Sequence, residues 1–360
     1  MPLILQRYII TEIIKPTVAI LVVLIAIFAS YTAVTYLAEA VVGALPPATV
    51  GLLILLKIGM ALEVLLPTTF YLSVVIALGR LYKDSEMTAF ASCGVGMGGV
   101  LKPVIVLALP LALAAGTASL ALRPAAYEQI YRILDQAKNE FDISRVGSDH
   151  FLVMNSGKLV FFADRVGERG RGAERVFIRV AEGINRQVIT AGEMIQVRAE
   201  GGGRRSLVFR DGTFLQFPIE GAGGRVTRFE RAEYPLPLEP SSDDRYRRKA
   251  VVTERLVGSS RLEDIAELQW RLSTPLSTLL LAILGVPLSR SDPRKGKYAK
   301  IGLAILIFAF YYQLFVIAKT WVEKGIVSPV IGIWWVPALL VLLTVVLLWN
   351  TGEVFCRRPR

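Results

Sequence analysis

The chain contains few of the side chains on which most enzyme active sites are built. Its 360 residues include one histidine and two cysteines. The sequence has no HExxH motif, no Cys/His metal cluster and no GxSxG nucleophile elbow. Gly296 and Lys297 match the end of a Walker A loop, but position 291, where such a loop has its first glycine, is serine. We therefore expect no catalytic residues, no ATP hydrolysis, no metal site and no cofactor in this chain.

Long apolar runs are what the sequence has instead. Hydrophobic residues make up 53% of the chain, and the mean hydropathy is +0.51. A helix needs about 20 predominantly apolar residues to cross the hydrocarbon core of a membrane. The pattern predicts a polytopic α-helical membrane protein with six transmembrane helices, three on each side of a polar middle. The predicted spans are Thr17–Ala38, Ala48–Gly79, Pro103–Leu122, Leu272–Ser289, Ile301–Ala318 and Ile331–Trp349.

The excess of positive charge belongs to the apolar parts of the chain. The net charge is +11, yet residues 123–270 hold 24 Lys and Arg against 22 Asp and Glu. Thirteen basic residues lie in the terminal segments and in loops 80–102 and 290–300, all on one side if the six spans alternate. Because Lys and Arg in short loops mark the cytoplasmic side, we expect both termini in the cytoplasm and 123–270 outside it. The charge is then a topology signal and not a nucleic-acid footprint.

These boundaries divide the sequence into three parts. Residues 1–122 form the N-terminal membrane half, 123–270 the extracytoplasmic domain, and 271–360 the C-terminal membrane half. Within the first part, Leu3–Ile14 mixes charged and apolar residues. It is compatible with an interfacial helix or with a cytoplasmic extension of the first span. Pro16 favours a helix start at its own position, since its missing N–H costs nothing in a first turn.

The polar middle has the pattern of an all-β domain. After a helical stretch near Pro124 to Asn139, short runs of β-forming residues alternate with Gly-rich breaks. Such spacing is typical of an antiparallel sandwich, a barrel or a jelly roll. His150 stands alone in this polar stretch and is expected to be structural. The predicted strands are 151–154, 158–164, 175–180, 187–189, 194–198, 206–210, 213–218 and 225–230.

The cytoplasmic loop after the second span contains a short amphipathic segment. Asp84 or Ser85 is suited to cap a helix there, and Gly94 to end it. Met87 and Phe90 lie three residues apart and therefore on one apolar face of that helix. A short amphipathic helix between two spans is how ABC permeases dock onto their ATPase subunits. The alternative is a solvated connector that rests on the lipid headgroups.

Two segments of the sequence carry a resemblance to a known family. Residues 79–94, GRLYKDSEMTAFASCG, look like a loop of the lipopolysaccharide export permeases, the LptF/LptG family. Residues 267–273 (ELQWRLS) and 285–296 (GVPLSRSDPRKG) are similar to the fourth span of that family and the loop after it. The three-plus-three arrangement around a central extracytoplasmic β domain is similar along the whole chain. The form of the first segment favours the F-type subunit over the G-type.

The resemblance implies a transport subunit and not an enzyme. Members of this family pair as F-type and G-type subunits on a dimeric cytoplasmic ATPase. The expected partners are thus an LptG-like permease, that ATPase, periplasmic bridge proteins and lipopolysaccharide. The family extracts lipopolysaccharide from the bacterial inner membrane and passes it through periplasmic jelly-roll domains to the bridge. The alternative is a mechanotransmission protein, in which ATP-driven motion acts on an extracytoplasmic partner and no lipid moves.

The resemblance also implies roles for residues of the cytoplasmic loop. In the family the loop helix, here residues 84–93, couples to the ATPase, and Ser85 and Glu86 match its Ser-Glu pair. Glu86 is then expected to meet basic groups of the ATPase, and Met87 and Phe90 to fill a groove on it. The first and fifth spans are expected to form lateral gates against the partner subunit.

Basic residues at the outer membrane rim are the candidates for binding phosphate groups of the lipid. A helix rise of about 1.5 Å per residue places Lys57 and Lys319 near the outer interface. Arg123 and Arg271 lie at span ends on the same level, and Lys319 also aligns with a basic position in the family's fifth span. The alternative for each is an anchor that snorkels to ordinary headgroups. Glu63 lies below the same interface and, as an ionisable group within a span, is a further functional candidate.

Overall fold

The computed structural model describes most of the chain. The described residues are 3–41, 45–139, 150–154, 159–166, 172–182, 185–198, 205–218, 224–235, 248–290 and 297–350. They belong to two compact units, one comprising Met1–Thr32, Ile54–Ile130 and Asp244–Arg360, the other Ala33–Leu53 and Tyr131–Asp243. The second unit contains the β strands, and its bounds differ from those of the predicted domain 123–270.

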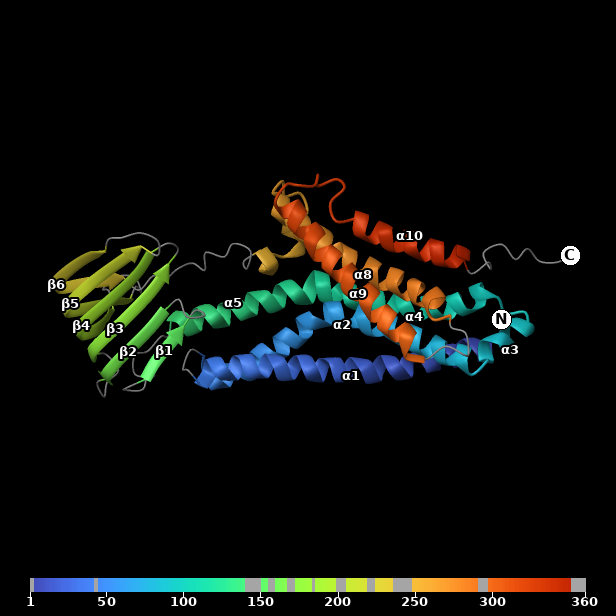
Figure 1. Ribbon diagram of the computed structural model, residues 1–360, viewed down its shortest axis with the longest axis horizontal. Helices are drawn as coiled ribbons and strands as arrows, with labels where there is room; N and C mark the ends of the chain where they lie inside the picture. The colour runs from blue at the N-terminus through green and yellow to red at the C-terminus, as the bar shows by residue number, and fades with distance from the viewer. Residues whose placement is uncertain are drawn as a thin grey trace. The chain divides into compact units, whose positions relative to one another are not determined.

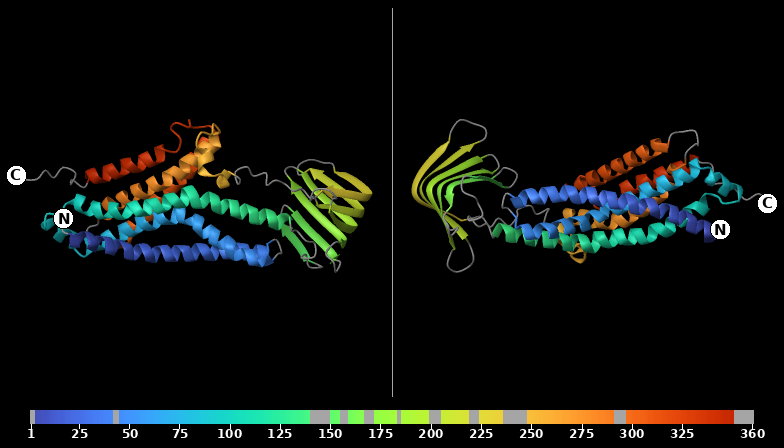
Figure 2. Two further views of the ribbon diagram at one scale, coloured as in Figure 1. Left: turned by 180° about the vertical axis from the view of Figure 1, so that it is seen from behind. Right: turned by 90° about the horizontal axis from the view of Figure 1, so that it is seen from below.

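The first unit is built mainly from long helices, of which α1, α2 and α4 run side by side (Figures 1 and 2). The long helices are α1 Leu3–Val41, α2 Pro47–Lys83, α4 Met97–Thr117, α5 Arg123–Asn139, α8 Leu262–Leu288, α9 Lys297–Glu323 and α10 Trp335–Asn350. Residues 33–41 of α1, 47–53 of α2 and 131–139 of α5 are assigned to the second unit. Two short helices, α3 and α7, span Glu86–Ser92 and Thr253–Leu256. A π-helical turn, η1, at Ala118–Leu122 continues α4 into α5.

The helices are those of a polytopic membrane protein. Among the described residues, five helical stretches are long and apolar enough to cross a membrane, one of them running from α4 through η1 into α5. The sixth predicted span, Ile331–Trp349, corresponds to a shorter apolar helix that begins only at Trp335. Gly332 has a φ of +52°, a left-handed conformation that is incompatible with a continuing helix, so the residues before Trp335 form turns.

Helix α1 is continuous from Leu3 to Val41, and Pro16 lies inside it. The prediction of a helix start at Pro16 was therefore wrong. Pro16 has no N–H and leaves the carbonyl oxygen of Glu12 without its helical donor, and one residue further on the hydroxyl of Thr17 donates to the carbonyl oxygen of Ile13 at 2.7 Å. The residues before Pro16 thus continue the first span and do not form a separate interfacial helix.

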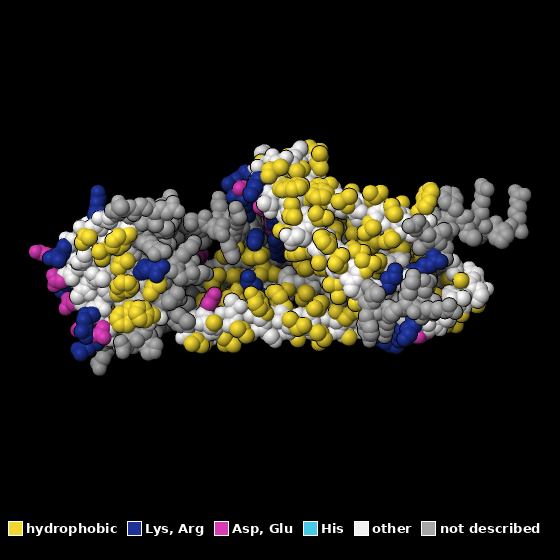
Figure 3. Space-filling view, viewed as in Figure 1, with side chains coloured by type: hydrophobic (Ala, Val, Ile, Leu, Met, Phe, Trp, Pro, Cys, Tyr) yellow, Lys and Arg dark blue, Asp and Glu magenta, His cyan; other side chains and the backbone are white. Residues whose placement is uncertain are grey.

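Two apolar cores hold the helices of the first unit together. One includes Tyr71 of α2 and Phe315 of α9, with residues of α8 and α10. The other includes Ile9 of α1, Phe70 of α2 and Val104 of α4, with residues of α8. Helices α2 and α8 contribute to both cores and form the central layer. The outer surface is largely hydrophobic, and in the view of Figure 3 the Lys and Arg side chains of this unit lie toward its two ends.

Helices α2 and α8 approach each other closely at Gly285. A Cβ at this position would lie 3.0 Å from Cγ1 and 3.2 Å from Cβ of Val74. Small residues let helix backbones approach, which matters in a membrane because lipid tails are as apolar as leucine and no hydrophobic force drives helices together. Gly285 therefore sets the distance between the two central helices.

The second unit contains one curved antiparallel sheet of six strands (Figure 2). The strands are β1 His150–Met154, β2 Leu159–Val166, β3 Gly172–Glu182, β4 Asn185–Arg198, β5 Arg205–Pro218 and β6 Arg225–Pro235. Each strand pairs with the next in the chain, so the sheet is a meander and lacks the Greek-key order of the predicted jelly roll. Successive strands are separated by only two to six residues, too few for the long return connection of a Greek key.

Strands β4 and β5 are longer than the sequence predicted. The sequence placed a break within each strand, at 190–193 and at 211–212. Both strands instead continue, with Ala191 paired to Gly212 across the two. Asp211 has a φ of +49°, so the backbone bends at this point without reversing its direction. Glycine and a left-handed residue inside a strand therefore marked a bend and not a turn.

Replacement of Gly285 by valine is expected to destabilise the first unit by about 1–3 kcal/mol, because the added carbons have no space between α8 and α2. Thermal unfolding in detergent, followed by circular dichroism, measures the change. Gly302→Val on α9 is the matched control, since a Cβ there meets nothing within 4 Å. Equal melting temperatures for the two variants would contradict the close approach of α2 and α8.

Candidate functional site

Helix α8 carries a polar stripe on an otherwise apolar surface. Glu267, Trp270, Arg271 and Thr274 follow at intervals of three and four residues and therefore lie on one helix face. Glu267 is 3% exposed and Arg271 is fully buried. Glu267 was not among the residues expected to have a functional role, although this spacing was the signal that could have identified it.

Glu267 contacts three cations. Its Oε1 lies 3.2 Å from Nη2 of Arg123 and 3.2 Å from Nε of Arg271, and its Oε2 lies 2.5 Å from Nζ of Lys319. The side chains of all four residues are between 0 and 15% exposed. Arg123 begins α5 and Lys319 lies on α9. Glu267 therefore links both of these helices to α8.

Glu63 of α2 is a second buried acceptor in the same region. Nη1 of Arg123 donates to both of its oxygens, at 3.0 and 3.2 Å. Its Oε1 also accepts from Nε1 of Trp270 at 2.7 Å, from the hydroxyl of Ser119 at 3.1 Å and from that of Thr274 at 3.2 Å. Ser119 belongs to the π-helical turn η1. The ionisable group that the sequence located within a span is thus fully partnered.

Arg271 directs its remaining donors at the segment that precedes α8. Its Nη1 donates to the carbonyl oxygen of Val251 and to Oγ1 of Thr253, both at 2.9 Å, and its Nη2 donates to the carbonyl oxygen of Lys249 at 3.1 Å. Thr253 in turn donates to the carbonyl oxygen of Leu120 in η1 at 2.7 Å. One guanidinium group therefore fastens this segment to α8.

Three cations lie around the ring of Tyr127. Nζ of Lys57, Nζ of Lys249 and Cζ of Arg123 lie 5.9, 5.5 and 6.0 Å from its centroid. An aromatic face attracts cations at such distances. The structure thereby brings all four basic residues singled out from the sequence into one region. These are Lys57, Arg123, Arg271 and Lys319.

We call Glu63, Arg123, Glu267, Arg271 and Lys319 the charge cluster. Its three cations exceed its two carboxylates by one, and Lys57 and Lys249 add positive charge beside it. Such an arrangement favours an anion at its accessible margin. In the parts of the chain that the structure describes, no group of three or more His, Cys, Asp or Glu side chains is placed to hold a metal ion.

The predicted coupling helix is present as α3. Ser85 occupies its N-cap position with a φ of +60°, and the Ser85 side chain makes no capping hydrogen bond. Gly94 follows the helix with a φ of +78°, and its N–H donates to the carbonyl oxygen of Ala91 at 2.9 Å. The helix therefore ends at the glycine that the sequence indicated, but it starts without the expected serine cap.

The side chains of α3 are turned partly toward their own chain. Glu86 accepts a hydrogen bond of 2.7 Å from the hydroxyl of Tyr8, and Met87 is 7% exposed within the core that α1, α2, α4 and α8 share. Phe90 packs against the same core and is half-buried. In this structure Met87 thus fills a space in its own chain, whereas the sequence assigned it to a groove on the ATPase. The exposed residues of the helix are Thr88, Ala89, Ala91 and Ser92.

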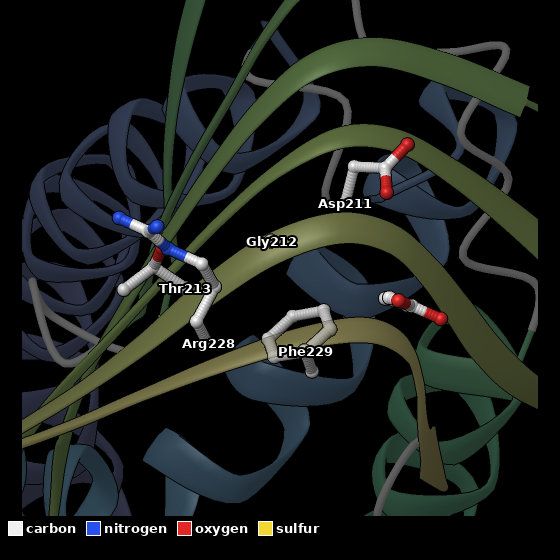
Figure 4. A pocket seen from close by; sticks show the side chains of 6 residues that line it. Asp211, Gly212, Thr213, Arg228 and Phe229 are labelled. Carbon is white, nitrogen blue, oxygen red and sulfur yellow. The ribbon is translucent and has the colours of Figure 1, made fainter.

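A further hollow of about 450 Å³ lies on the sheet. It is lined by Asp211, Gly212, Thr213, Arg228, Phe229 and Glu230. In Figure 4 the ring of Phe229 lies beside the backbone of Gly212. A Cβ at Gly212 would clash with this ring and with the backbone of Thr190, so the close approach requires glycine. The hollow is lined by both acidic and basic side chains, and its lining therefore favours neither an anion nor a cation.

Replacement of Glu63 by glutamine is expected to cost about 3–5 kcal/mol of stability, because it leaves Arg123 buried without one of its counter-ions. Glu263→Gln on α8 is the control: its partner Arg248 lies 2.6 Å away, but the Glu263 side chain is 36% exposed, so the loss should stay below about 1 kcal/mol. Unfolding of both variants in detergent checks the difference. A Glu63→Gln protein as stable as Glu263→Gln would contradict the buried pairing.

Comparisons with known proteins identify the family of the chain. The chain matches the family model of the lipopolysaccharide export system permease LptF/LptG over residues 7–350. It is 26% identical over 363 aligned positions to the lipopolysaccharide export system permease protein LptF of Escherichia coli K12, covering 98% of this chain and 96% of that protein. The LptF proteins of Escherichia coli O157:H7 and Shigella flexneri match to the same extent. The chain belongs to the LptF/LptG family of lipopolysaccharide export permeases.

Proposed function

We propose that this chain is the permease subunit of an ABC-type exporter that extracts lipopolysaccharide from the inner membrane and passes it to a periplasmic bridge. Its family supports a role in lipopolysaccharide export by a multi-pass inner membrane protein. The observation that carries the proposal is the charge cluster, a net positive site within helices whose outer surface is apolar. A phosphorylated, acylated lipid needs both a positive site and an apolar surface, because its phosphate groups bind cations and its acyl chains pack against apolar side chains.

The four basic residues contribute differently to binding phosphate groups. The Lys319 side chain is 15% exposed and Lys57 is half-buried, whereas Arg123 and Arg271 are 8% and 0% exposed. We assign direct phosphate contact first to Lys319 and Lys57. Arg123 and Arg271 are held by carboxylates and carbonyl groups of their own chain. They support binding by adding positive potential.

The opposite end of the helices serves the ATPase in this proposal. The cytoplasmic helix α3 presents a row of small exposed residues to a separate dimeric ATPase, which hydrolyses ATP. Its other face is fixed by Glu86 to Tyr8 of α1, and Arg80 of α2 lies 2.9 Å from Glu12 of α1. These contacts support transmission of movement from α3 to the first span. An LptG-like subunit pairs with this F-type chain, and α1 and α9 form lateral gates against it, with the sheet in the periplasm and both termini in the cytoplasm.

Charge reversal at the start of α3 should uncouple the ATPase. Glu86→Arg removes the contact with Tyr8 and the charge assigned to the ATPase interface. We expect at least about tenfold less ATPase in co-purification, the order for one charge-assisted hydrogen bond, and a matching loss of lipid export. Glu254→Arg is the control, because Glu254 is likewise the first-turn acidic residue of a short helix, α7. Intact association and export in Glu86→Arg would refute the coupling role.

Photo-crosslinking separates lipid export from mechanotransmission without lipid movement. Benzoylphenylalanine at the exposed Val316, three residues before Lys319 and therefore on the same face of α9, and at Phe229 in the hollow of the sheet should form lipopolysaccharide adducts in cells. The same probe at Trp349, at the other end of the membrane half, should form none. Adducts are detected with antibody to lipopolysaccharide on the purified chain. Their absence at both test positions would favour a protein that transmits motion to an extracytoplasmic partner.

A further inference from the structure

Lys319 is the cation of the charge cluster that a ligand reaches most readily. Its side chain is more exposed than those of the two arginines, and the ring of Trp270 covers part of it at 5.0 Å from the centroid. Within the described residues, Glu267 is the only carboxylate in salt-bridge contact with Lys319. A ligand anion that binds Lys319 therefore competes directly with Glu267.

The two oxygens of Glu267 have different partners. Its Oε1 is held by the guanidinium groups of Arg123 and Arg271, whereas its Oε2 contacts only the ammonium group of Lys319 among the described residues. Loss of Lys319 therefore does not leave the carboxylate without a counter-ion. The Lys319–Glu267 contact can open without leaving a buried charge unpaired, provided that another anion takes its place at Lys319.

The same contact fastens two helices to each other, since Glu267 lies on α8 and Lys319 on α9. Neutral contacts join these helices as well. The hydroxyl groups of Ser277 and Tyr311 lie 2.5 Å apart, and the rings of Trp270 and Phe315 lie 5.1 Å apart. When the ionic contact opens, the neutral contacts remain. Ala318 and Val322 of α9 are also fully buried, in the apolar core that includes Ala266 of α8. Opening would therefore remove the ionic restraint on this end of α9 and leave apolar packing alone to hold it.

We propose that Glu267 is an internal counter-anion that a phosphate group of the transported lipid displaces from Lys319, and that this exchange removes the ionic restraint that holds the end of α9 on α8. The inference rests on the proposed function, because it takes the ligand to be a phosphorylated lipid. A phosphate monoester carries a charge of about −1.5 to −2 at pH 7 and so outcompetes a carboxylate for an ammonium group. The phosphodiester of an ordinary phospholipid carries one negative charge and gains no such advantage. Glu267 is thus a positioning residue that selects monoesters.

The binding test uses the complete complex, with its paired permease and ATPase, in phosphatidylcholine nanodiscs. Diphosphorylated lipid A and lipid A stripped of its phosphates are the probes. Glu267→Gln should tighten binding of the phosphorylated probe by about tenfold, because the competing carboxylate is gone, and leave binding of the stripped probe unchanged. Glu323→Gln is the matched control: Glu323, four residues from Lys319 on α9, attracts Lys319 at longer range without the 2.5 Å contact that Glu267 makes. It should change the affinity for the phosphorylated probe much less than Glu267→Gln does and leave the stripped probe unchanged.

A distance measurement tests the loss of this restraint on α9. Spin labels at the exposed positions Leu272 of α8 and Trp321 of α9, which lies beyond Lys319, are introduced after the native cysteines, Cys93 and Cys356, are replaced by serine. In the otherwise wild-type complex the distance should lengthen with lipid A, but not with phosphatidylglycerol or inorganic phosphate. In Glu267→Gln it should be long before lipid is added.

The outcomes distinguish this inference from the proposed function. Suppose that the wild-type complex binds lipid A, and that Glu267→Gln changes neither the affinity for lipid A nor the distance between the labels on α8 and α9. This result overturns the exchange but does not contradict lipid export. An equal response to phosphatidylglycerol makes ordinary headgroups the displacing anion and overturns the selection of monoesters. A wild-type complex that does not bind lipid A overturns both proposals.

Lys319→Gln provides a second test if Glu267→Gln fails to assemble, since Glu267 then keeps both arginines as partners. This variant should weaken the preference for phosphorylated over stripped lipid A by about tenfold, with Lys57 retaining the remainder. Its α8–α9 distance should be long with or without lipid. A Lys319→Gln complex that keeps the preference and the lipid-dependent change in distance contradicts the exchange.

Discussion

Ionised side chains inside an apolar helical unit have to be paired, and in this protein that constraint determines the register of the helices. Apolar faces can slide by a turn at little cost, but a carboxylate moved away from its cations is stranded in surroundings where a bare charge costs several kcal/mol or more. Glu63 on α2 and Glu267 on α8 share Arg123, and Glu267 also holds Lys319 of α9. Two carboxylates thus align four helical segments, and the apolar cores and the small contact at Gly285 supply the close packing.

The same pairing lets an apolar helical unit contain buried cations without the free-energy cost of leaving them unpaired. Each cation has an internal partner while the site is empty, and the excess positive charge remains at the margin near Lys319 and Lys57. The site is therefore assembled in the absence of a ligand. The acidic residues near α3 are paired in a similar way, since Glu86 of α3 and Glu12 of α1 are held by Tyr8 and Arg80.

Much of this architecture could be predicted from the sequence, and the failures have physical reasons. Long apolar runs identified the spans, and charges inside them were conspicuous enough to single out all four basic residues. Glu267 was overlooked because the predicted domain boundary at 270 placed it outside the membrane half, whereas α8 begins at Leu262. The amphipathic face of α3 was recognised, but such a pattern cannot say which surface covers Met87. The strands were predicted, but local composition does not indicate that β5 continues through Asp211 or that the strands pair in meander order.

The π-helical turn at Ala118–Leu122 has a geometric consequence for the whole helix that contains it. A single residue inserted into an α-helix turns everything after it by about 100° relative to an uninterrupted helix. η1 therefore rotates α5 about the helix axis relative to α4. Helix α4 packs in the apolar core, and Arg123, the first residue of α5, faces Glu63 and Glu267. The number of residues in this segment, more than their identity, determines the helix face on which Arg123 lies. Deleting one residue there would place the guanidinium group on a different side of the helix.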